Sequence, residues 1–433
     1  MMDPEPKYSP DLSPDNGADQ QYDKPLPNRD HLLQWMEIAV AEAEKRTGTG
    51  GVKMQDAYVV YLVESKVSDP EMPGYGHPPT SLWRRYSEFE LLRNYLEVTF
   101  PALVIPVLPE KRYLDVVTHA WQKLASDRFD SDFIDRRRIG LENFLLRVAS
   151  HKALSKDRIF HGFLKQEESW KESVYATDFQ SKADSKIRAL SASYRLKKPD
   201  RRFEETKNYS NELQTHITNI LKLRAKLADR QYGIHKLHAN YGRVFKEWSG
   251  IERDMAPGLQ SAGQFMDVYS GSIQGYLEDE EQFVDQLKEY YAFGDSLRSV
   301  CRKQELLQLD LEKAEDSLSY KHQQKDQLQQ GKTGGFSLSG MKTKLFGGDT
   351  PEQREVKIKQ LEEQITENEE LVDTSQKELQ DFLQVSIKDI GRFKRQKVKD
   401  VKDIFLNYSV MQIERCKKNI QLWQSMRECF EKM

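Results

Sequence analysis

Apolar residues recur with two different periods along this sequence, and the change of period divides the chain. In the first part they alternate with polar residues, as at Met36, Ile38 and Val40, or form short β-branched and aromatic runs at 58–63 and 81–86. From residue 200 onward they recur every seven residues, at Leu213, Ile220, Leu227, Ile234, Tyr241 and Trp248. These patterns predict a small three-stranded sheet followed by long helices.

The seven-residue repeat predicts three long helices. The first covers about fifty residues, or about 80 Å, and should break at Pro257-Gly258. The second runs from Leu259 to about Gln330, where the glycine-rich segment 331–348 interrupts the pattern. Thr350 as N-cap and Pro351 at the first helical position start the third, which continues to the C-terminus. Because each is longer than a globular core, we expect an antiparallel coiled-coil bundle.

Large aromatic side chains lie on the apolar side of these helices. Tyr241, Trp248, Tyr408 and Trp423 would leave one face of the bundle wet unless a second copy covered it. The pattern therefore predicts a dimer.

Composition argues against several classes of protein. The 433 residues carry 66 Lys and Arg against 69 Asp and Glu, a net charge of −3, so no overall positive field points to nucleic acid. The three cysteines have no metal-ligand spacing, which favours a reducing compartment. No apolar run of about twenty residues and no leader sequence is evident. No catalytic motif is present either, so we expect neither an enzyme nor a cofactor.

Four regions follow from these patterns. Residues 1–28 are rich in proline and acid and are predicted to be disordered. Residues 29–168 should form an α+β domain, and residues 200–433 the all-α bundle. Between them, 169–199 is a linker in which 175–198 reads as a basic amphipathic helix. That helix would either lie in a membrane interface or dock on a neighbouring helix.

The stretch Arg84-Arg85-Tyr86-Ser87-Glu88-Phe89 joins a strand pattern to a helix start. Ser87 with Glu90 reads as a capping box that opens a helix over 87–98. Free backbone N–H groups, the helix dipole, a serine hydroxyl and a fork-shaped arginine would all favour a phosphate at this joint. The alternative is a solvated strand edge with Tyr86 and Phe89 in the core.

Two later motifs supply further cations. Pro106-Val107-Leu108-Pro109 is a short polyproline-like run that leads to Lys111. Arg136-Arg137-Arg138 precedes the amphipathic pattern 139–145.

Together, RRYSEF, PVLPEK and RRIGLENFL in this order resemble the PX domain, the phosphoinositide-binding module of sorting nexins. The resemblance implies that Arg85 grips the 3-phosphate, Tyr86 supports the inositol ring, Ser87 and Lys111 contact phosphates, and Arg138 holds the remaining ring oxygens. With three long helices after it, the chain resembles the PX-BAR sorting nexins, whose BAR domain is a dimeric crescent of helices on curved membrane.

This resemblance implies a non-enzymatic peripheral protein that binds phosphatidylinositol 3-phosphate on the cytosolic face of early endosomes. It would sense or induce curvature and sort transmembrane cargo into recycling tubules, with a possible part in autophagy-related traffic. Its partner would be a second copy or a related sorting nexin, and no nucleic acid. Lysines and arginines in 388–402 and 222–230 are candidates for the membrane-facing charge.

The alternative is a coiled-coil scaffold or tether whose PX-like module binds protein instead of lipid. The complete set Arg85, Lys111 and Arg138 favours lipid, because a protein-binding relic has no need of three cations around one pocket.

Overall fold

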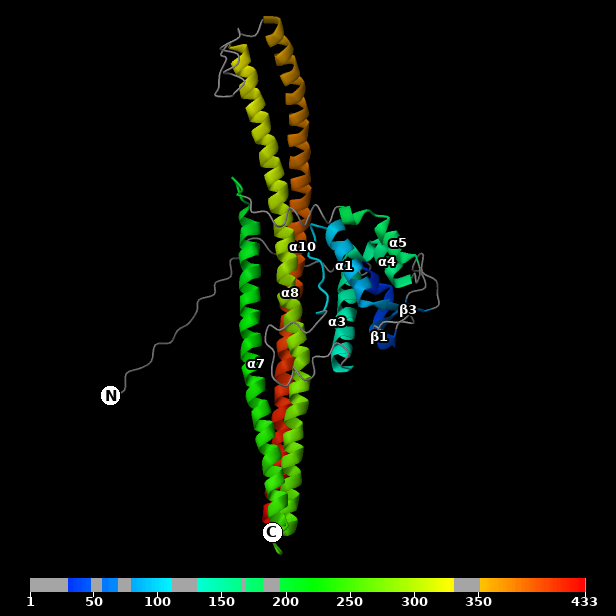
Figure 1. Ribbon diagram of the computed structural model, residues 1–433, viewed down its shortest axis with the longest axis vertical. Helices are drawn as coiled ribbons and strands as arrows, with labels where there is room; N and C mark the ends of the chain where they lie inside the picture. The colour runs from blue at the N-terminus through cyan, green and yellow to red at the C-terminus, as the bar shows by residue number, and fades with distance from the viewer. Residues whose placement is uncertain are drawn as a thin grey trace, which may run out of the picture.

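A small α+β domain packs against the side of a long helical bundle in the computed structural model, which describes residues 30–47, 57–68, 79–110, 131–165, 169–181, 195–330 and 351–432 (Figure 1). The sheet of this domain has three antiparallel strands in the order β1-β2-β3, which confirms the predicted strands. They are β1 (Met36–Thr47), β2 (Ala57–Val67) and β3 (Thr80–Arg85).

The pairing of β2 with β3 determines the directions in which the side chains of the two adjacent arginines point. Tyr61 pairs with Arg84 and Val60 pairs with Arg85. Because successive strand residues point to opposite faces, the two guanidiniums separate. Arg84 is only 1% exposed, whereas Arg85 lies on the surface.

The described residues of this domain add the helices α1 (Tyr86–Thr99), α3 (Ser131–Ser150), α4 (Arg158–Lys165) and α5 (Trp170–Tyr175), with short 3-10 turns η1 (Leu32–Gln34) and η2 (Leu154–Lys156). Helices α1 and α3 each present an apolar face at helical spacing to the sheet. Phe89 and Leu92 from α1 and Leu141 and Phe144 from α3 are completely buried in one core.

The bundle consists of α7 (Arg201–Ser249), α8 (Ala256–Gln329) and α10 (Pro351–Glu431), as the seven-residue repeat predicts. Both α8 and α10 continue past the start of α7 as a two-helix arm (Figure 1). The predicted break at Pro257-Gly258 is wrong in position, because α7 ends at Ser249 and Pro257 lies in the first turn of α8. Proline is tolerated there because the first N–H groups of a helix have no intrahelical acceptor.

The second half of α7 approaches α8 closely through small residues. A Cβ on Gly242 would lie 3.0 Å from the Gly263 carbonyl oxygen, and a Cβ on Gly263 would lie 2.9 Å from the Gly242 carbonyl oxygen. Ala225 and Ala228 are also buried on this side of α7. In this part of α7, small residues therefore face α8, and the larger apolar side chains lie on another side of the helix.

The predicted linker helix over 175–198 is wrong at its C-terminal end. Residues 182–194 lie outside the described residues, but 195–198 are not helical. The backbone N–H groups of Lys197 and Lys198 both donate to the Glu312 carboxylate of α8, at 2.9 and 3.0 Å. Two charge-assisted hydrogen bonds to the bundle replace the helical ones at this point.

The buried guanidinium of Arg84 is a structural element of the α+β domain. Its Nε and Nη2 donate to the Phe163 carbonyl oxygen at 3.2 and 2.8 Å, and Nη1 donates to Glu88 at 3.4 Å. The rings of Phe163 and Trp170 pack on its plane, at 4.9 and 5.3 Å. The guanidinium is thus desolvated and fully engaged.

We expect Arg84→Ala to lower the free energy of unfolding of this domain by about 3 kcal/mol, because the buried Glu88 carboxylate would lose its ion pair with the Arg84 guanidinium. Urea unfolding followed by the fluorescence of buried Trp170 measures the loss. A loss below about 0.5 kcal/mol, the size of a surface substitution, would contradict this assignment.

Candidate functional site

The joint between β3 and α1 forms a helix N-terminus one residue earlier than predicted. Helix α1 begins at Tyr86, and the backbone N–H of its N-cap residue, Arg85, donates to the Glu88 carboxylate at 2.7 Å. The predicted capping box of Ser87 with Glu90 is therefore wrong. Glu88 occupies the third helical position and satisfies the N-cap N–H, which leaves the Ser87 side chain exposed in the first turn.

The Arg85 guanidinium stands at the positive end of α1. It stacks on the ring of Tyr58 from β2, 3.9 Å from the ring centroid. No carboxylate of the described residues forms an ion pair with it. Stacking orients the planar cation while its N–H groups stay available, which suits a bidentate contact with a phosphate.

Tyr86 connects this joint to the proline segment. Its hydroxyl donates to the Pro109 carbonyl oxygen at 2.5 Å, and the guanidinium carbon of Arg137 lies 5.2 Å from its ring centroid. Burial raises the pKa of Tyr86 well above its usual range, so the hydroxyl remains a donor. The ring is thereby fixed beside Arg85.

Pro109 also touches α3. A Cβ on Gly140 would come within 2.7 Å of the Pro109 side chain, so glycine permits the proline segment to lie against this helix. The three sequence motifs consequently meet around Pro109. Lys111, the next predicted site residue, lies outside the described residues.

Arg138 is held by neighbours of its own. Its Nε donates to Asp135 at 2.7 Å and its Nη1 donates to the Val40 carbonyl oxygen of β1 at 2.7 Å. Helix α3 begins at Ser131, so the three arginines lie inside it and not before it. An anion that binds Arg138 would have to share this guanidinium with the Asp135 carboxylate or displace that carboxylate. The Arg85 guanidinium has no such ion pair among the described residues.

Two residues of the site escape the sequence reasoning. Tyr58, the platform under Arg85, is reached only through the β2–β3 register, since it lies two residues from Val60, the partner of Arg85. Arg137 contacts Tyr86 and is also buried beside Phe133, 4.3 Å from its ring centroid. No local pattern distinguishes Arg137 from its neighbours in the Arg136-Arg137-Arg138 run.

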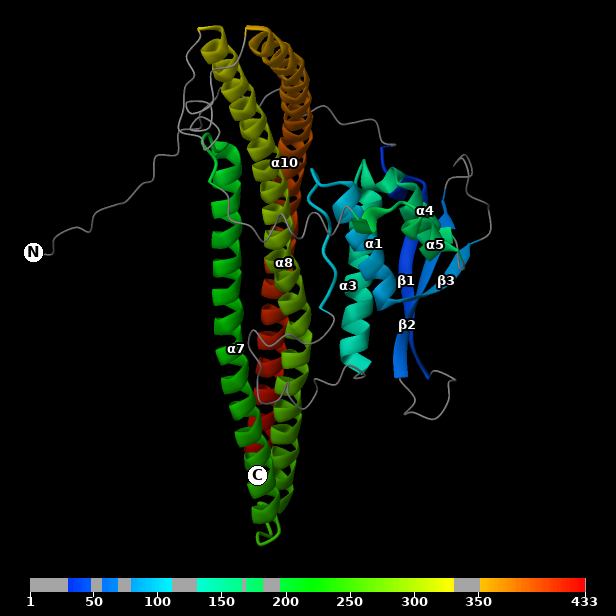
Figure 2. The same ribbon diagram turned by 45° about the horizontal axis from the view of Figure 1, so that its top comes forward.

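Helix α3 lies between the sheet and the bundle, in contact with both (Figure 2). Arg136 and Arg147 share one face of it, because eleven residues are about three turns, and His151 continues that face directly after the last residue of the helix. Arg136 pairs with Glu281 at 2.9 Å, and Arg147 pairs with Glu289 at 2.5 Å. This α3 face therefore brings cations to carboxylates of α8.

The third contact of this face is with α10 and is the most buried. Asp389, only 5% exposed, accepts hydrogen bonds from His151 Nε2 at 2.9 Å, the Val104 backbone N–H at 2.8 Å and Arg392 Nε at 2.6 Å. His151 Nδ1 accepts the N–H of Ala153, so its Nε2 carries the hydrogen. Burial alone would raise the pKa of Asp389, but the hydrogen bonds from His151 and Arg392 outweigh it and lower the pKa to about 2.

The predicted membrane-facing charges are only partly on the surface. Arg224 is wrong as a surface charge, because it is buried and donates to Glu281 at 2.8 Å. Arg392 pairs with Asp389, and Lys397 donates to the Tyr209 hydroxyl at 2.6 Å. The exposed members of the two clusters are Lys222, Lys226, Arg230, Lys388, Lys394, Arg395, Lys399 and Lys402.

A stripe of apolar side chains on α7 lies open to solvent. The exposed side chains, spaced three, four or seven residues apart, are Leu223, Leu227, Ile234, Leu237, Tyr241, Val244 and Trp248, and Ile251 follows just beyond the end of the helix. Helix α10 adds Leu406, Val410, Ile413, Ile420 and Trp423. Tyr408 differs from the expectation, since its ring packs on Phe283 at 4.5 Å within the chain.

Comparison with known proteins agrees with this arrangement. The PX domain family matches residues 72–167. Sorting nexin-4 of Mus musculus is 54% identical over 401 residues, which are 93% of this chain and 88% of the relative. The chain belongs to the sorting nexin family. Sorting nexin-4 of Bos taurus is 52% identical over 433 residues, 100% of this chain and 94% of the relative.

The long helices have a counterpart among solved structures. The SNX-BAR protein Mvp1, solved as a tetramer, matches with a TM-score of 0.56 at 17% identity, over 90% of this chain and 99% of Mvp1. The fold is therefore that of a PX-BAR sorting nexin. None of the helices within the described residues combines the length and apolar composition that a bilayer crossing requires.

Membership of this family assigns the chain to membrane-associated trafficking. A PX domain implies attachment to the membrane surface through phosphoinositides, and the BAR fold implies dimerisation. PX-BAR sorting nexins are non-enzymatic scaffolds.

We expect Asp389→Asn to lower the free energy of unfolding by about 2 kcal/mol at pH 7, because a carboxylate with a pKa of about 2 in the folded chain is replaced by an amide. The folded pKa lies below the ordinary value of 3.8, so this stabilisation is complete above about pH 4 and is lost as the pH falls toward 2.

Urea unfolding between pH 7 and pH 3 measures the difference between the wild type and Asp389→Asn. It should shrink at the acidic end. A difference that stays constant over the whole range would show that the Asp389 charge contributes nothing at the joint.

Proposed function

We propose that this chain binds phosphatidylinositol 3-phosphate through the joint of β3 and α1. The supporting observation is the meeting of three motifs around Pro109, with an exposed guanidinium at a helix N-terminus. Arg85 grips the 3-phosphate, Tyr86 supports the inositol ring, and the Ser87 hydroxyl donates to phosphate oxygen. Lys111 contacts a phosphate and Arg138 the ring oxygens.

Membrane attachment uses a second contact besides this pocket. The exposed cations Lys394, Arg395 and Lys399 of α10 attract anionic lipid at about 1 kcal/mol for each well-placed charge. Because pocket and cations belong to one molecule, the second contact forms at a high effective concentration. A curved anionic membrane that reaches both is therefore favoured over a flat or neutral one.

The compartment and process follow from the lipid. Phosphatidylinositol 3-phosphate recognition would recruit the protein to the cytosolic face of early endosomes. There the BAR dimer senses or induces curvature and sorts transmembrane cargo into recycling tubules, and the same activity serves autophagy-related traffic. The rival function, a scaffold whose PX domain binds protein, predicts no dependence on this lipid.

We expect Arg85→Ala to abolish binding to vesicles containing phosphatidylinositol 3-phosphate, since a bidentate contact with a phosphate is worth about 1.5 to 3 kcal/mol. Vesicle co-sedimentation measures the loss, and Lys should substitute poorly. Arg46→Ala is the matched control, because Arg46 is another arginine of the sheet, stacked on Trp83 at 4.6 Å. Unchanged sedimentation of folded Arg85→Ala protein would sink the assignment.

The exposed stripe on α7 is the proposed dimer surface. Its side chains Leu237, Tyr241 and Trp248 are 61%, 56% and 42% exposed, far more apolar surface than a soluble helix usually leaves to water. A second copy or a related sorting nexin would bury it. Isologous pairing of this stripe would place each aromatic residue at the centre of a hydrophobic interface.

Tyr241→Glu should convert a dimer into a monomer at micromolar concentration, because it buries a charge without a partner in that interface. Sedimentation velocity reports the state. Asn240→Glu is a charge-matched control at the preceding, exposed position of the same helix. A wild-type chain that stays monomeric, alone and with related sorting nexins, would contradict the proposed surface.

A further inference from the structure

An extended segment between α1 and α3, residues 102–110, belongs to two hydrophobic cores at once. We call it the strap. Leu103 and Ile105 are buried in the core of the α+β domain, whereas Val104 and Val107 are buried in the core of the bundle. Neighbouring side chains of an extended chain point in opposite directions, which explains why Val104 faces the bundle while Leu103 and Ile105 face the domain; Val107, beyond Pro106, departs from this alternation. It runs between the bundle and the rest of the domain (Figure 2).

Polar contacts from the bundle fix the strap along its length. The Val104 N–H donates to Asp389 at 2.8 Å, and the Ser296 hydroxyl of α8 donates to the Ile105 carbonyl oxygen at 2.9 Å. Further along, Lys288 donates to Glu110 at 3.3 Å. All three partners come from α8 and α10, and the first two satisfy backbone groups of a segment that is not in a sheet.

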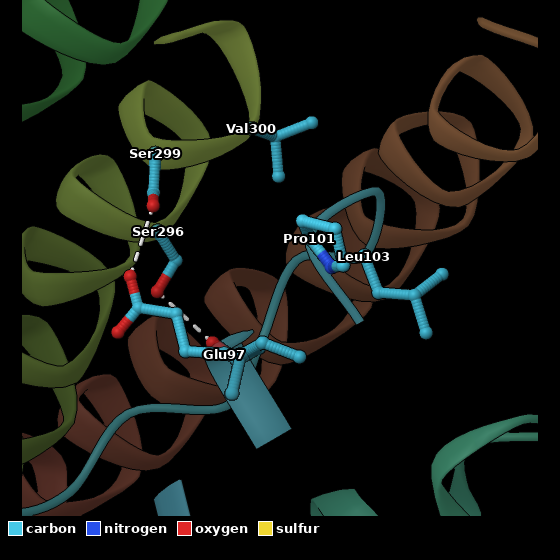
Figure 3. Close-up of a pocket in the computed structure, with 7 residues that line it drawn as sticks. Glu97, Pro101, Leu103, Ser296, Ser299 and Val300 are labelled. Atoms are coloured by element: carbon cyan, nitrogen blue, oxygen red, sulfur yellow. Dashed lines mark hydrogen bonds between the residues drawn. The ribbon is translucent and has the colours of Figure 1, made fainter. Parts of the chain in front are cut away.

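A second serine of α8 donates its hydrogen bond to α1 and not to the strap. The Ser299 hydroxyl donates to Glu97 of α1 at 2.9 Å (Figure 3). Ser296 and Ser299 are three residues apart and line the same small pocket, together with Leu103. They form a natural pair in which Ser296 donates its hydrogen bond to the strap and Ser299 donates to α1.

The far end of the strap is part of the candidate site. The Pro109 carbonyl oxygen accepts the hydrogen bond of Tyr86, and the Pro109 ring packs on Gly140 of α3. The bundle is therefore linked to the Tyr86 ring by a short chain of contacts along the strap. Tyr86 itself adjoins Arg85, the proposed phosphate ligand.

We propose that the BAR bundle preorganises the phosphoinositide pocket by holding the strap, so that Val104, Val107 and Ser296 are positioning residues for head-group binding. This inference rests on the proposed function of the site. A strap without these contacts would have to lose its conformational freedom when the head group binds, and that cost would appear as weaker affinity. By linkage, head-group binding would in turn strengthen the joint between the two domains.

Calorimetric titration of the full-length chain with soluble inositol 1,3-bisphosphate tests this proposal, since it measures the pocket without any membrane. The double variant Val104→Ala/Val107→Ala should bind about fivefold or more weakly. Ser296→Ala should bind about two- to fivefold more weakly, as expected for one neutral hydrogen bond. Ser299→Ala should bind as the wild type does.

Ser296→Ala changes only one hydroxyl and keeps the test valid if the double variant does not fold. Thermal unfolding accompanies each titration, because a merely structural role would lower Tm and leave the dissociation constant unchanged. Strap variants that fold and bind the head group as the wild type does would overturn this inference but leave the proposed function intact. Equal weakening by Ser299→Ala would overturn it too, because the effect would then belong to the whole joint. A wild-type chain that does not bind the head group would overturn the proposed function itself.

Discussion

The arrangement of the two domains depends on a buried carboxylate. Asp389 of α10 has lost its hydration shell, and three donors replace it: His151 directly after α3, the Val104 N–H from the strap and Arg392 from its own helix. Burying a carboxylate is costly unless such donors are in place, so the charge is stable only when both domains are docked. Arg147, which pairs with Glu289 and stacks over Phe293, extends this joint along α3.

Helix α3 transmits that constraint to the candidate site. The side of the helix with Arg136 and Arg147 faces the bundle, and Arg138 points to Val40 of β1, since two residues along a helix correspond to more than half a turn. A helix that contacts the bundle on one side and the sheet on the other fixes the candidate site relative to the bundle.

The bundle has an unusual distribution of polarity in the second half of α7. Gly242 and Ala228 face α8, together with the ion pair of Arg224 and Glu281, whereas the large apolar residues of the heptad face solvent. The ion pair and the close backbone approach hold α7 against α8, and the hydrophobic stripe of α7 takes no part in this contact. The stripe therefore remains exposed along α7.

The sequence by itself determined the elements of this protein, because hydrophobic periodicity and local motifs are properties of neighbouring residues. The three strands, the three long helices and the RRYSEF motif follow from it. Tertiary structure alone decided which arginine is buried: strand register turned Arg84 inward and Arg85 outward. It also decided that Glu88, not Glu90, satisfies the start of α1, since the exact N-cap depends on where β3 ends. The strap shows most clearly what local sequence patterns cannot predict. Nothing local in Val104 and Val107 indicates that their side chains belong to the core of helices some two hundred residues away, because long-range packing is encoded only by the complementarity of distant surfaces.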